Sequence, residues 1–380
     1  MQPFIKYLRI ENYKSIDKLE LHDLPPFAVF AGANGSGKSN FFDALEFVSE
    51  ISRFDVQTAM REGYDRIHSL LRNGQDAETF GFEIFMDNPL VQSNNTSVTI
   101  SHQDADSYFG GYCRLELNIK NWALQPRLDE KFWFTEGEPH HIRIGSDYFI
   151  DGRKIQETHT SFLNMFQTDL NLFLNRARLF HIDPIGLPIL ATTTNNNVEL
   201  DKRGYNVASV LERLEKDDEI REIILDMLSL CVPSIENISV KKNRLSMSSE
   251  LYFKQEGIDQ EFPIGMVSDG TIALLCILVA VLDTKKRAGL TMIEEPERGL
   301  HPEAISQIVA FMRERATSRN PIWLTTHSEA VIRATQEGDL FFVEKEDGRT
   351  VIKPALPYTN GSFSRDRAWL SNALGGGLPW

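Results

Sequence analysis

The chain has 380 residues, of which 42% are hydrophobic and 25% charged, as is ordinary for a globular protein of one large or two smaller domains. Its formal net charge of −14 excludes a general electrostatic attraction to nucleic acid or to an anionic membrane. The three cysteines lie far apart without a C-x-x-C motif, so neither a disulfide framework nor a zinc site is indicated. Because the N-terminus lacks the hydrophobic region of a signal peptide, we expect a cytoplasmic protein without a membrane segment.

Short strands interrupted by one helix are predicted for about the first 155 residues. Apolar patterns typical of strands occur at residues 4–10, 19–21, 27–31, 79–86, 97–100, 112–119 and 132–134. A helix is expected from about Asn40 to Ser52, because apolar side chains recur there at helical spacing. Further along, Asp151-Gly152 lies between two extended runs and predicts the turn of a β-hairpin.

The pattern becomes helical between about residues 158 and 232, most clearly over residues 207–230. A polar tract at residues 192–197, with prolines before it, indicates a loop inside this region. Strand character returns at residues 238–253. The remaining apolar segments predict, in order, a helix over 271–282, a strand over 290–293, a helix over 303–317 and a strand over 322–325. This alternation is typical of βαβ units in a largely parallel sheet.

A phosphate-loop motif lies between the strand at residues 27–31 and the helix that follows it. Residues 32–39 read GANGSGKS, a complete G-x-x-x-x-G-K-S motif in the strand-then-helix context that its mechanism needs. Glycines allow backbone N–H groups to surround phosphates, the lysine reaches the β- and γ-phosphates, and the serine can hold Mg²⁺. We therefore predict ATP or GTP binding. The cofactor-binding residues expected here are Asn34, Gly35, Ser36, Gly37, Lys38, Ser39 and Asn40.

Three further segments carry polar residues at the ends of predicted elements. The strand at residues 290–293 runs into Glu294-Glu295, which places two carboxylates at the ligand-binding edge of an α/β sheet, one suited to Mg²⁺ and one to polarising water. The next strand is followed by His327, where a histidine can act on a ligand at that edge. Residues 268–270 (Ser-Asp-Gly) can bind phosphate or simply cap the apolar helix, and taken alone the cap is the better interpretation.

Five segments follow one another in a recognisable order. They are residues 10–15 (IENYKS), 32–40 (GANGSGKSN), 268–271 (SDGT), 292–302 (MIEEPERGLHP) and 325–328 (TTHS). In this ordered set the chain resembles ABC-type ATPases of the SMC/RecF/OLD group, especially their compact prokaryotic members, many of which act in phage defence or DNA repair. The resemblance spans nearly the whole chain. It implies an α/β ABC-ATPase fold, with a mixed, largely parallel sheet, flanking helices, an antiparallel β lobe and a helical insertion.

The resemblance also implies how nucleotide is bound, with ATP and Mg²⁺ as cofactors. The phosphate loop corresponds to Walker A, and Lys14 belongs to the first lobe, where side chains can approach the nucleotide. Ser268 and Gly270 correspond to the signature motif, which closes over ATP held by another subunit. The metal would be held by Ser39 and Glu294.

For catalysis, the resemblance implies that Glu295 polarises the attacking water and that His327 is the switch histidine, with a D-loop at about residues 297–301. The motifs depart from the transporter type, since the signature reads Ser-Asp-Gly and Walker B ends in Glu-Glu. The position of the Q-loop glutamine stays open between Gln57, Gln156 and Gln167.

These features divide the chain into three parts. Residues 1–155 would form an N-terminal ATPase lobe with Walker A and the β-rich region, 156–235 a mainly helical insertion, and 236–380 a C-terminal ATPase lobe with the signature, Walker B and the switch histidine. The sequence contains no sustained heptads, so coiled-coil arms are not expected. The stretch after His327 is too short for the Toprim nuclease domain that OLD proteins carry, so an effector would be a separate chain.

Two hypotheses for function follow. The first is an ATPase that forms a homodimer or higher oligomer through its ATP sites and controls a separate effector, a nuclease or toxin, in anti-phage defence. The alternative is a RecF-like DNA-binding repair clamp, against which the net charge counts. Its candidate basic patches are Lys241, Lys242 and Arg244, and Lys285, Lys286 and Arg287, although short charge runs usually form solvated surface. The inserted regions do not suit a transporter subunit.

Overall fold

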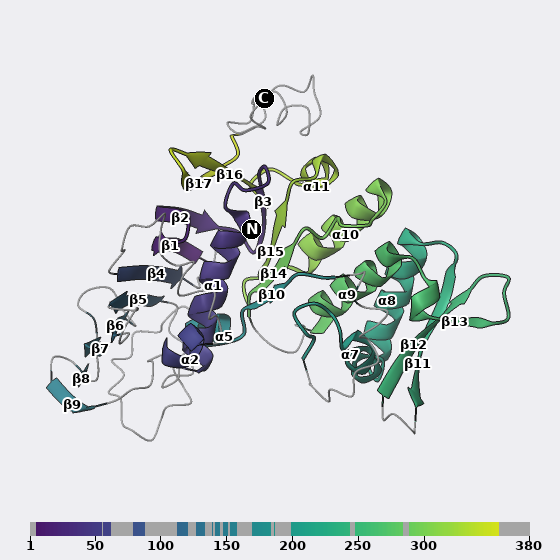
Figure 1. The fold of residues 1–380 in the computed structure, drawn as a ribbon, viewed down its shortest axis with the longest axis horizontal. Helices are drawn as coiled ribbons and strands as arrows, with labels where there is room; N and C mark the ends of the chain where they lie inside the picture. Colours follow the sequence, from purple (N-terminus) through teal and green to yellow (C-terminus); the bar gives the residue numbers. More distant parts are fainter. Residues whose placement is uncertain are drawn as a thin grey trace, which may run out of the picture.

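The computed structural model of the chain describes residues 5–54, 56–61, 79–87, 112–120, 127–133, 139, 141–144, 147–150, 153–157, 169–183, 186, 199–243, 248–283 and 289–356. This part of the chain forms three β-sheets and the helices that pack against them (Figure 1). A six-stranded sheet runs through the middle of the molecule. An eight-stranded sheet lies on one side of it, and helices with a three-stranded sheet lie on the other.

The six-stranded sheet has the strand order β10-β14-β15-β3-β16-β17. Its strands are β3 (Phe27–Ala31), β10 (Arg178–Phe180), β14 (Thr291–Glu294), β15 (Ile322–Thr326), β16 (Leu340–Glu346) and β17 (Arg349–Pro354). All neighbours pair in parallel except β16 and β17. The strands β3 and β15 are buried along their whole length, as expected for central parallel strands that are covered on both faces.

The eight-stranded sheet is antiparallel throughout and has the order β2-β1-β4-β5-β6-β7-β8-β9. Its strands are β1 (Ile5–Tyr13), β2 (Ile16–Leu24), β4 (Thr79–Asp87), β5 (Tyr112–Lys120), β6 (Arg127–Trp133), β7 (His141–Ile144), β8 (Asp147–Ile150) and β9 (Arg153–Glu157). Every second residue is buried along residues 114–119 of β5, including Leu115 and Leu117, and around Leu8 and Ile10 of β1. This alternation is the mark of a sheet with one face on the core.

The helices cover both faces of the central sheet. They are α1 (Lys38–Arg53), α2 (Val56–Arg61), α5 (Asp169–Asn175), α7 (Val207–Leu214), α8 (Asp218–Cys231), α9 (Asp269–Leu282), α10 (Pro302–Arg315) and α11 (Glu329–Ala334), with a 3₁₀ turn η1 (Ile264–Met266). The three-stranded sheet, β11 (Ile235–Asn243), β12 (Ser248–Gln255) and β13 (Glu261–Pro263), adjoins α7 and α8. Residues 271–282 of α9 are buried without exception, yet none of the described helices has the length and apolarity needed to cross a membrane.

Two hydrophobic cores lie on opposite faces of the central sheet, and the alternation of β3 assigns its side chains to them. Val29 belongs to the core with α7–α10, whereas Phe30 belongs to the core with α1 and the eight-stranded sheet. Phe30 stands at the centre of an aromatic group in which its ring lies 4.8 Å from that of Phe41 and 5.7 Å from that of Trp323. These contacts fix the helix that follows the phosphate loop onto the sheet.

The predicted α/β fold class is confirmed, and most predicted strands are present. The helix expected near Asn40 begins at Lys38, and β8 and β9 form the predicted hairpin, with Ile150 opposite Arg153. The predicted strand at 97–100, the loop at 192–197 and the patch at 285–287 lie outside the described residues.

The structure adds detail to other expectations. The helical stretch at 207–230 is two helices, α7 and α8, and the strand region at 238–253 is two strands, β11 and β12. The region 156–235 contains β10, an edge strand of the central sheet, so it is more than a helical insertion, and the three-part division stays a proposal. The strands β16 and β17 were not predicted.

Candidate active site

The functional residues gather where parallel strands of the central sheet end. Because β3, β10, β14 and β15 are parallel, their carboxyl ends lie at one edge, the edge at which sheets of this kind bind ligands. The phosphate loop follows β3, and the second acid of the Glu294-Glu295 pair follows β14. A cavity of about 470 Å³ opens here, lined by Asn34, Gly35, Gly37, Lys38, Ser39, Asn40, His181, Glu294, Glu295, Arg298, Thr325 and Lys345.

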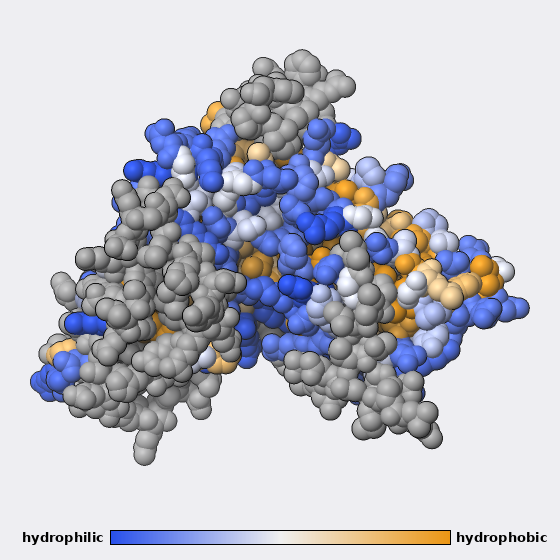
Figure 2. Space-filling view, viewed as in Figure 1, coloured by the Kyte–Doolittle hydropathy of each residue, from blue (hydrophilic) through white to orange (hydrophobic). Residues whose placement is uncertain are grey.

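A second cavity of about 840 Å³ shares part of this lining. Its described lining residues are Asn34, Gly35, Glu295, Glu297, Arg298, Leu300, Ile305, His327 and Ser328. The predicted Walker A residues, the acidic pair and the predicted switch histidine are therefore brought to adjoining spaces. On the face shown in Figure 2, hydrophilic residues dominate the described centre of the molecule.

The phosphate loop ends at the first turn of α1 and is tightly fitted. Gly37 caps the helix with a φ of 107°, a left-handed conformation that glycine tolerates and other residues rarely adopt. A Cβ at Gly37 would also collide with the Thr350 hydroxyl of β17. The glycine is thus required by backbone conformation and by space. The N-terminus of α1 carries the partial positive charge that attracts phosphate.

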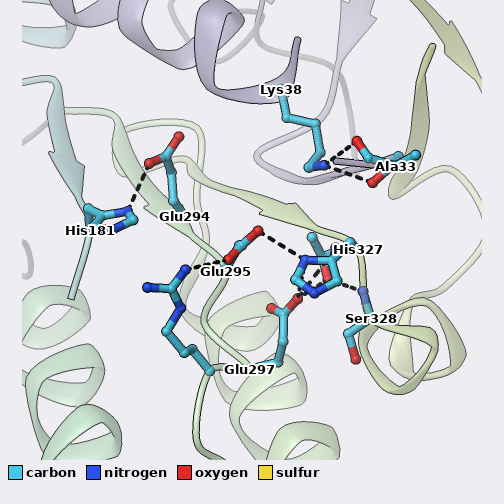
Figure 3. Close-up of polar contacts among 11 residues, drawn as sticks. Ala33, Lys38, His181, Glu294, Glu295, Glu297, His327 and Ser328 are labelled. Atoms are coloured by element: carbon cyan, nitrogen blue, oxygen red, sulfur yellow. Dashed lines mark hydrogen bonds and ion pairs between the residues drawn. The ribbon is translucent and has the colours of Figure 1, made fainter. Parts of the chain in front are cut away.

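Lys38 is held inside the loop that precedes it. Its Nζ donates hydrogen bonds to the carbonyl oxygens of Gly32, at 2.7 Å, and Ala33, at 2.9 Å (Figure 3). Burial lowers the pKa of Lys38, and the nearby carboxylates, Glu295 foremost, oppose that shift. The amine feels the charge of these carboxylates, but its hydrogen-bond partners are neutral carbonyls. An anionic phosphate would therefore be a stronger partner.

Glu294 points away from Glu295, towards β10. Its Oε2 lies 3.1 Å from Nδ1 of His181, and its Oε1 is buried without a hydrogen-bond partner in the described structure (Figure 3). A buried, unpartnered carboxylate oxygen is costly unless a ligand satisfies it. Mg²⁺ prefers one or two protein oxygens together with substrate phosphates and water. Glu294 and Ser39, which line the same cavity, fit that requirement.

Glu295 has both carboxylate oxygens engaged. Oε1 lies 2.9 Å from Nδ1 of His327, and Oε2 accepts a hydrogen bond from Arg298 at 3.0 Å. Burial alone would raise the pKa of Glu295, but the hydrogen bond from Arg298 and the charge of His327 outweigh it and leave the pKa lowered. The residue has a φ of 46°, an uncommon left-handed value for a non-glycine and one that clusters at functional sites.

Glu297 supports the segment that carries His327. Its Oε1 accepts hydrogen bonds from the Thr326 hydroxyl, at 2.6 Å, and from the His327 backbone N–H, at 3.4 Å. Its Oε2 is buried without a partner among the described residues. Burial raises the pKa of Glu297, and the Thr326 hydrogen bond opposes the rise. The carboxyl therefore joins the segment after β14 to the end of β15.

The predicted signature residues lie outside the described lining of both cavities. Ser268 is the N-cap of α9, and its Oγ accepts a hydrogen bond from the Thr271 backbone N–H at 3.3 Å. A Cβ at Gly270 would collide with the carbonyl oxygen of Gly299. Within one copy of the chain, both residues therefore have structural partners. The helix-capping interpretation of Ser268 is correct for its local contacts.

Lys14 also lies outside the two linings. Its Nζ forms an ion pair with Asp43 of α1 at 2.7 Å. Asn40 lines the first cavity, but its amide donates to Oγ of Ser15 at 2.6 Å. The two residues thus connect the β1–β2 turn to the helix that follows the phosphate loop.

The sequence assigned no individual role to four residues at the site, of which Arg298 lies within the predicted D-loop: His181, Arg298, Lys345 and Thr350. Two carried a usable signal, since His181 follows the short apolar run of β10 and Arg298 lies in the same segment as the acidic pair. Of the candidate Q-loop glutamines, Gln57 falls in α2 and Gln156 in β9, elements outside the central sheet, and Gln167 lies outside the described residues. The strand that pairs with β14 is β10, and it ends immediately before His181.

Solved structures with a similar fold are heads of SMC proteins. The SMC head bound to the C-terminal winged-helix domain of ScpA has a TM-score of 0.57, with 15% identity, 92% of this chain covered and 98% of that chain. An SMC head with an extended coiled coil, bound to the C-terminal domain of ScpA from Pyrococcus furiosus, has a TM-score of 0.55, with 14% identity and coverage of 93% and 96%. At such identities the likeness shows the fold.

Curated relatives match the sequence of this chain over alignments of very different length. The Old nuclease of Escherichia phage P2 is 22% identical over 373 residues, 91% of this chain and 60% of that protein. Structural maintenance of chromosomes protein 2 of Gallus gallus is 25% identical over 243 residues, 62% of this chain and 18% of that protein. RecF of Corynebacterium jeikeium (strain K411) is 34% identical over only 55 residues. The chain thus spans less than two thirds of each of these relatives.

Residues 27–333 match the family AAA_21, described as "AAA domain, putative AbiEii toxin, Type IV TA system". The match runs from β3 to α11 and so includes the phosphate loop, the acidic pair and His327. The chain belongs to this family, and it is an ABC-type ATPase of the SMC/RecF/OLD kind.

Proposed function

We propose that this ATPase is a nucleotide-gated switch, in which two copies close over ATP and the closed state is sensed by a separate partner. The observation that carries the proposal is the separation of the two halves of the predicted site. The phosphate loop and acidic pair share one cavity, whereas Ser268 and Gly270 lie outside it. Ser268 is exposed, as is Met266 two residues before it, with 73% of its surface accessible. A second copy could bring this exposed segment to the first copy's nucleotide.

In the proposed reaction, water attacks the γ-phosphorus of ATP and the bond from that phosphorus to the β–γ bridging oxygen breaks. Glu295 accepts the proton of the attacking water, and ADP leaves with the electron pair of the broken bond. Lys38 binds the phosphates, and His327 lies beside the Glu295 carboxylate to orient it. Mg²⁺, held by Ser39 and Glu294, would neutralise charge on the phosphate oxygens.

Gating follows from where ATP would be bound. A ligand that contacts both copies stabilises the closed dimer by an amount that grows with the logarithm of its free concentration once that exceeds Kd. Hydrolysis removes the γ-phosphate and with it part of that stabilisation, so the dimer opens again. In this proposal the product of the ATPase is a conformational state.

A separate effector and a role in anti-phage defence are supported by the relatives. The family description refers to the AbiEii toxin and a type IV TA system, and the Old nuclease of a phage aligns with 91% of this chain. The SMC heads of similar fold are bound to another protein, ScpA. We propose that the partner here is likewise a different chain, a nuclease or toxin.

A RecF-like DNA clamp is the second candidate, and RecF is named as a DNA replication and repair protein. The described part of the candidate basic patch is ion-paired, Lys241 with Glu261 and Lys242 with Glu212. Paired lysines offer little free charge to a phosphate backbone. Binding to duplex DNA that weakens steeply with added salt would favour the clamp over the effector switch.

The direct test of the catalytic assignment is the variant Glu295→Gln. It should bind ATP at least as tightly as the wild type and hydrolyse it at least about a hundredfold more slowly, the loss expected for a missing general base. Glu222→Gln, at an exposed position of α8, is the matched control and should keep the wild-type rate. Hydrolysis at the wild-type rate by Glu295→Gln would show that another group activates the water.

The partner is tested by purification of tagged chain from its native host. Glu295→Gln should retain a specific protein in the presence of ATP and Mg²⁺, and Lys38→Ala should not. Equal recovery of the same protein with both variants would contradict nucleotide-gated recognition.

A further inference from the structure

Arg298 is the one described cation among the residues that line both cavities at the site. Of its side chain, 54% is exposed. Its position is set locally, because the Arg298 backbone N–H donates to the Glu295 carbonyl at 3.1 Å. This is the hydrogen bond of a four-residue turn with Pro296 at its second position, where proline is favoured. The turn brings the guanidinium back onto the Glu295 carboxylate.

The two carboxylate oxygens of Glu295 have different partners. Oε1 is engaged by His327 at 2.9 Å and Oε2 by Arg298 at 3.0 Å. A carboxylate has about four lone-pair sites, so these contacts leave room for a water proton, but each charge-assisted contact stabilises the ionised form and weakens it as a base. Loss of one contact would therefore make Glu295 a stronger base.

Arg298 is the more exposed of the two partners of Glu295, with 54% of its side chain accessible against 45% for His327. The described cations that line the first cavity are Lys38, Arg298 and Lys345. Lys38 is nearly buried and fixed by two carbonyl oxygens. Arg298, by contrast, is half exposed, and a guanidinium offers a planar fork that matches phosphate oxygens in pairs. A terminal phosphate carries more charge than one carboxylate and is therefore its stronger partner.

We propose that Arg298 distinguishes ATP from ADP by exchanging its contact with Glu295 for one with the γ-phosphate. The exchange links recognition to catalysis, because the same movement removes from Oε2 a contact that stabilises the ionised form of the base. ADP lacks the γ-phosphate and leaves the Arg298–Glu295 pair intact. This inference rests on the proposed role of Glu295 in hydrolysis and adds a residue that determines nucleotide specificity.

The first test compares affinities by calorimetry, with Mg²⁺, for ADP and for an ATP analogue whose β–γ bridge is an imido group that resists hydrolysis. Arg298→Gln should weaken binding of the triphosphate roughly tenfold or more, the loss of a charge-assisted hydrogen bond, and leave ADP affinity unchanged. Arg298→Lys keeps the positive charge but lacks the planar fork of the guanidinium. Its triphosphate affinity should lie between those of the wild type and Arg298→Gln. Arg221→Gln, on the exposed face of α8, controls for net charge and should change neither affinity.

The second test asks whether Arg298 and Glu295 compete. Glu295→Gln releases the guanidinium, so triphosphate affinity should rise relative to ADP affinity. In the double variant Glu295→Gln/Arg298→Gln that gain should disappear, because nothing is left to release. Melting temperatures close to that of the wild type would establish that the variants fold.

The possible results separate the inference from the function on which it rests. If Arg298→Gln changes both affinities equally, or changes only the rate of hydrolysis, Arg298 merely orients Glu295 and the inference is overturned. If the gain in triphosphate affinity of Glu295→Gln persists in the double variant, the inference is also overturned. The gain would then come only from the lost repulsion between the Glu295 carboxylate and the phosphate. A wild-type chain that binds neither nucleotide would overturn the inference and the proposed function together.

Discussion

At the scale of single residues, Lys38 is the side chain on which nucleotide binding depends most directly. It is only 6% exposed, and its contacts in the structure are backbone carbonyls that phosphate would replace. We expect Lys38→Ala to lower ATP affinity by about a hundredfold, because a buried charge-assisted contact to phosphate is lost. Calorimetry would measure the change. Lys216→Ala, at an exposed position between α7 and α8, should bind like the wild type, and unchanged affinity in Lys38→Ala would rule out the phosphate-loop assignment.

Glu297 makes a prediction about stability and pH. Burial raises the pKa of its carboxyl, so the folded state binds the proton more tightly than the unfolded state does. The contribution of this group is therefore most favourable below about pH 4, the usual pKa of an unfolded glutamate, and is lost as pH rises through the folded pKa. Relative to the wild type, Glu297→Gln should gain in free energy of unfolding as pH rises from about 4 to 7.

Urea unfolding at several pH values would measure this difference. The amide oxygen of glutamine can still accept the hydrogen bond of Thr326, so the comparison isolates the charge. A stability difference between the two proteins that stays constant from acid to neutral pH would mean that Glu297 is not held in its raised-pKa environment.

At the scale of elements, a chain of hydroxyl groups braces the phosphate loop against β17. Thr350, which is 1% exposed, donates to the Ser36 carbonyl at 3.0 Å. Its hydroxyl lies 2.6 Å from that of Ser15, which must therefore be the donor of that pair. The amide of Asn40 donates to Ser15 in turn. These hydrogen bonds are all donated in one direction, from Asn40 in the first turn of α1, through Ser15 of the β1–β2 turn and Thr350, to the Ser36 carbonyl of the loop.

This brace can be tested with two substitutions of Thr350. Thr350→Val keeps the shape and removes the hydrogen bonds, which should cost about 1 kcal/mol or more in stability because the Ser15 donor and the Ser36 acceptor are left unpaired. Nucleotide affinity should fall with it, whereas Thr350→Ser should retain most of both. Thermal unfolding and calorimetry would measure the two effects. Equal behaviour of the Val and Ser variants would show that the hydroxyl has no part in shaping the loop.

The N-terminus of α9 offers a second prediction at this scale. Gly270 packs against the carbonyl of Gly299, so Gly270→Ala would disturb the fold and says little about ligand contact. Ser268→Ala is the cleaner variant, because it removes only a helix cap worth about 1 kcal/mol. If Ser268 acts on the ATP of a second copy, hydrolysis falls strongly while ATP affinity at low protein concentration is unchanged. Ser306→Ala, on the exposed face of α10, controls for loss of a surface hydroxyl.

The elements that sequence predicted well are those whose pattern depends on local physics. The phosphate loop with its flanking strand and helix, and the apolar α9, follow from spacing and hydrophobicity. The break between α7 and α8 coincides with the charged residues 215–219 (EKDDE), which interrupt the apolar spacing, so this signal was available in the sequence. The hairpin of β16 and β17 did carry a signal in Asp347-Gly348, an Asp-Gly pair with positive φ at both residues, as two-residue hairpin turns require.

The site was predicted less completely than the fold, for a physical reason. Residues that follow strands in the sequence motifs were found, since parallel strands bring their ends to one edge. His181 and Thr350 come from strands distant in sequence from the phosphate loop, and only the pairing order of the sheet places them beside it. Arg298 lies within the predicted D-loop, but its contact with Glu295 was not predicted, because the direction of the side chain depends on the turn at Pro296.

At the scale of the whole molecule, the two cores on opposite faces of the central sheet connect the nucleotide edge to both lobes. The phosphate loop leads into α1 and the eight-stranded sheet, and the acidic segment leads through Gly299 to α9 and the helical lobe. The central sheet, with its nucleotide edge, thus lies between the two lobes (Figure 1). We propose that ATP converts this arrangement into a closed dimer.

The most direct measurement is the mass of the Glu295→Gln variant by light scattering, with ATP and Mg²⁺, with ADP and Mg²⁺, and without nucleotide. The account predicts a dimer or larger species with ATP alone, and its loss when Lys38→Ala is added. A mass that is the same under all three conditions, whether monomer or oligomer, would contradict a nucleotide-gated switch.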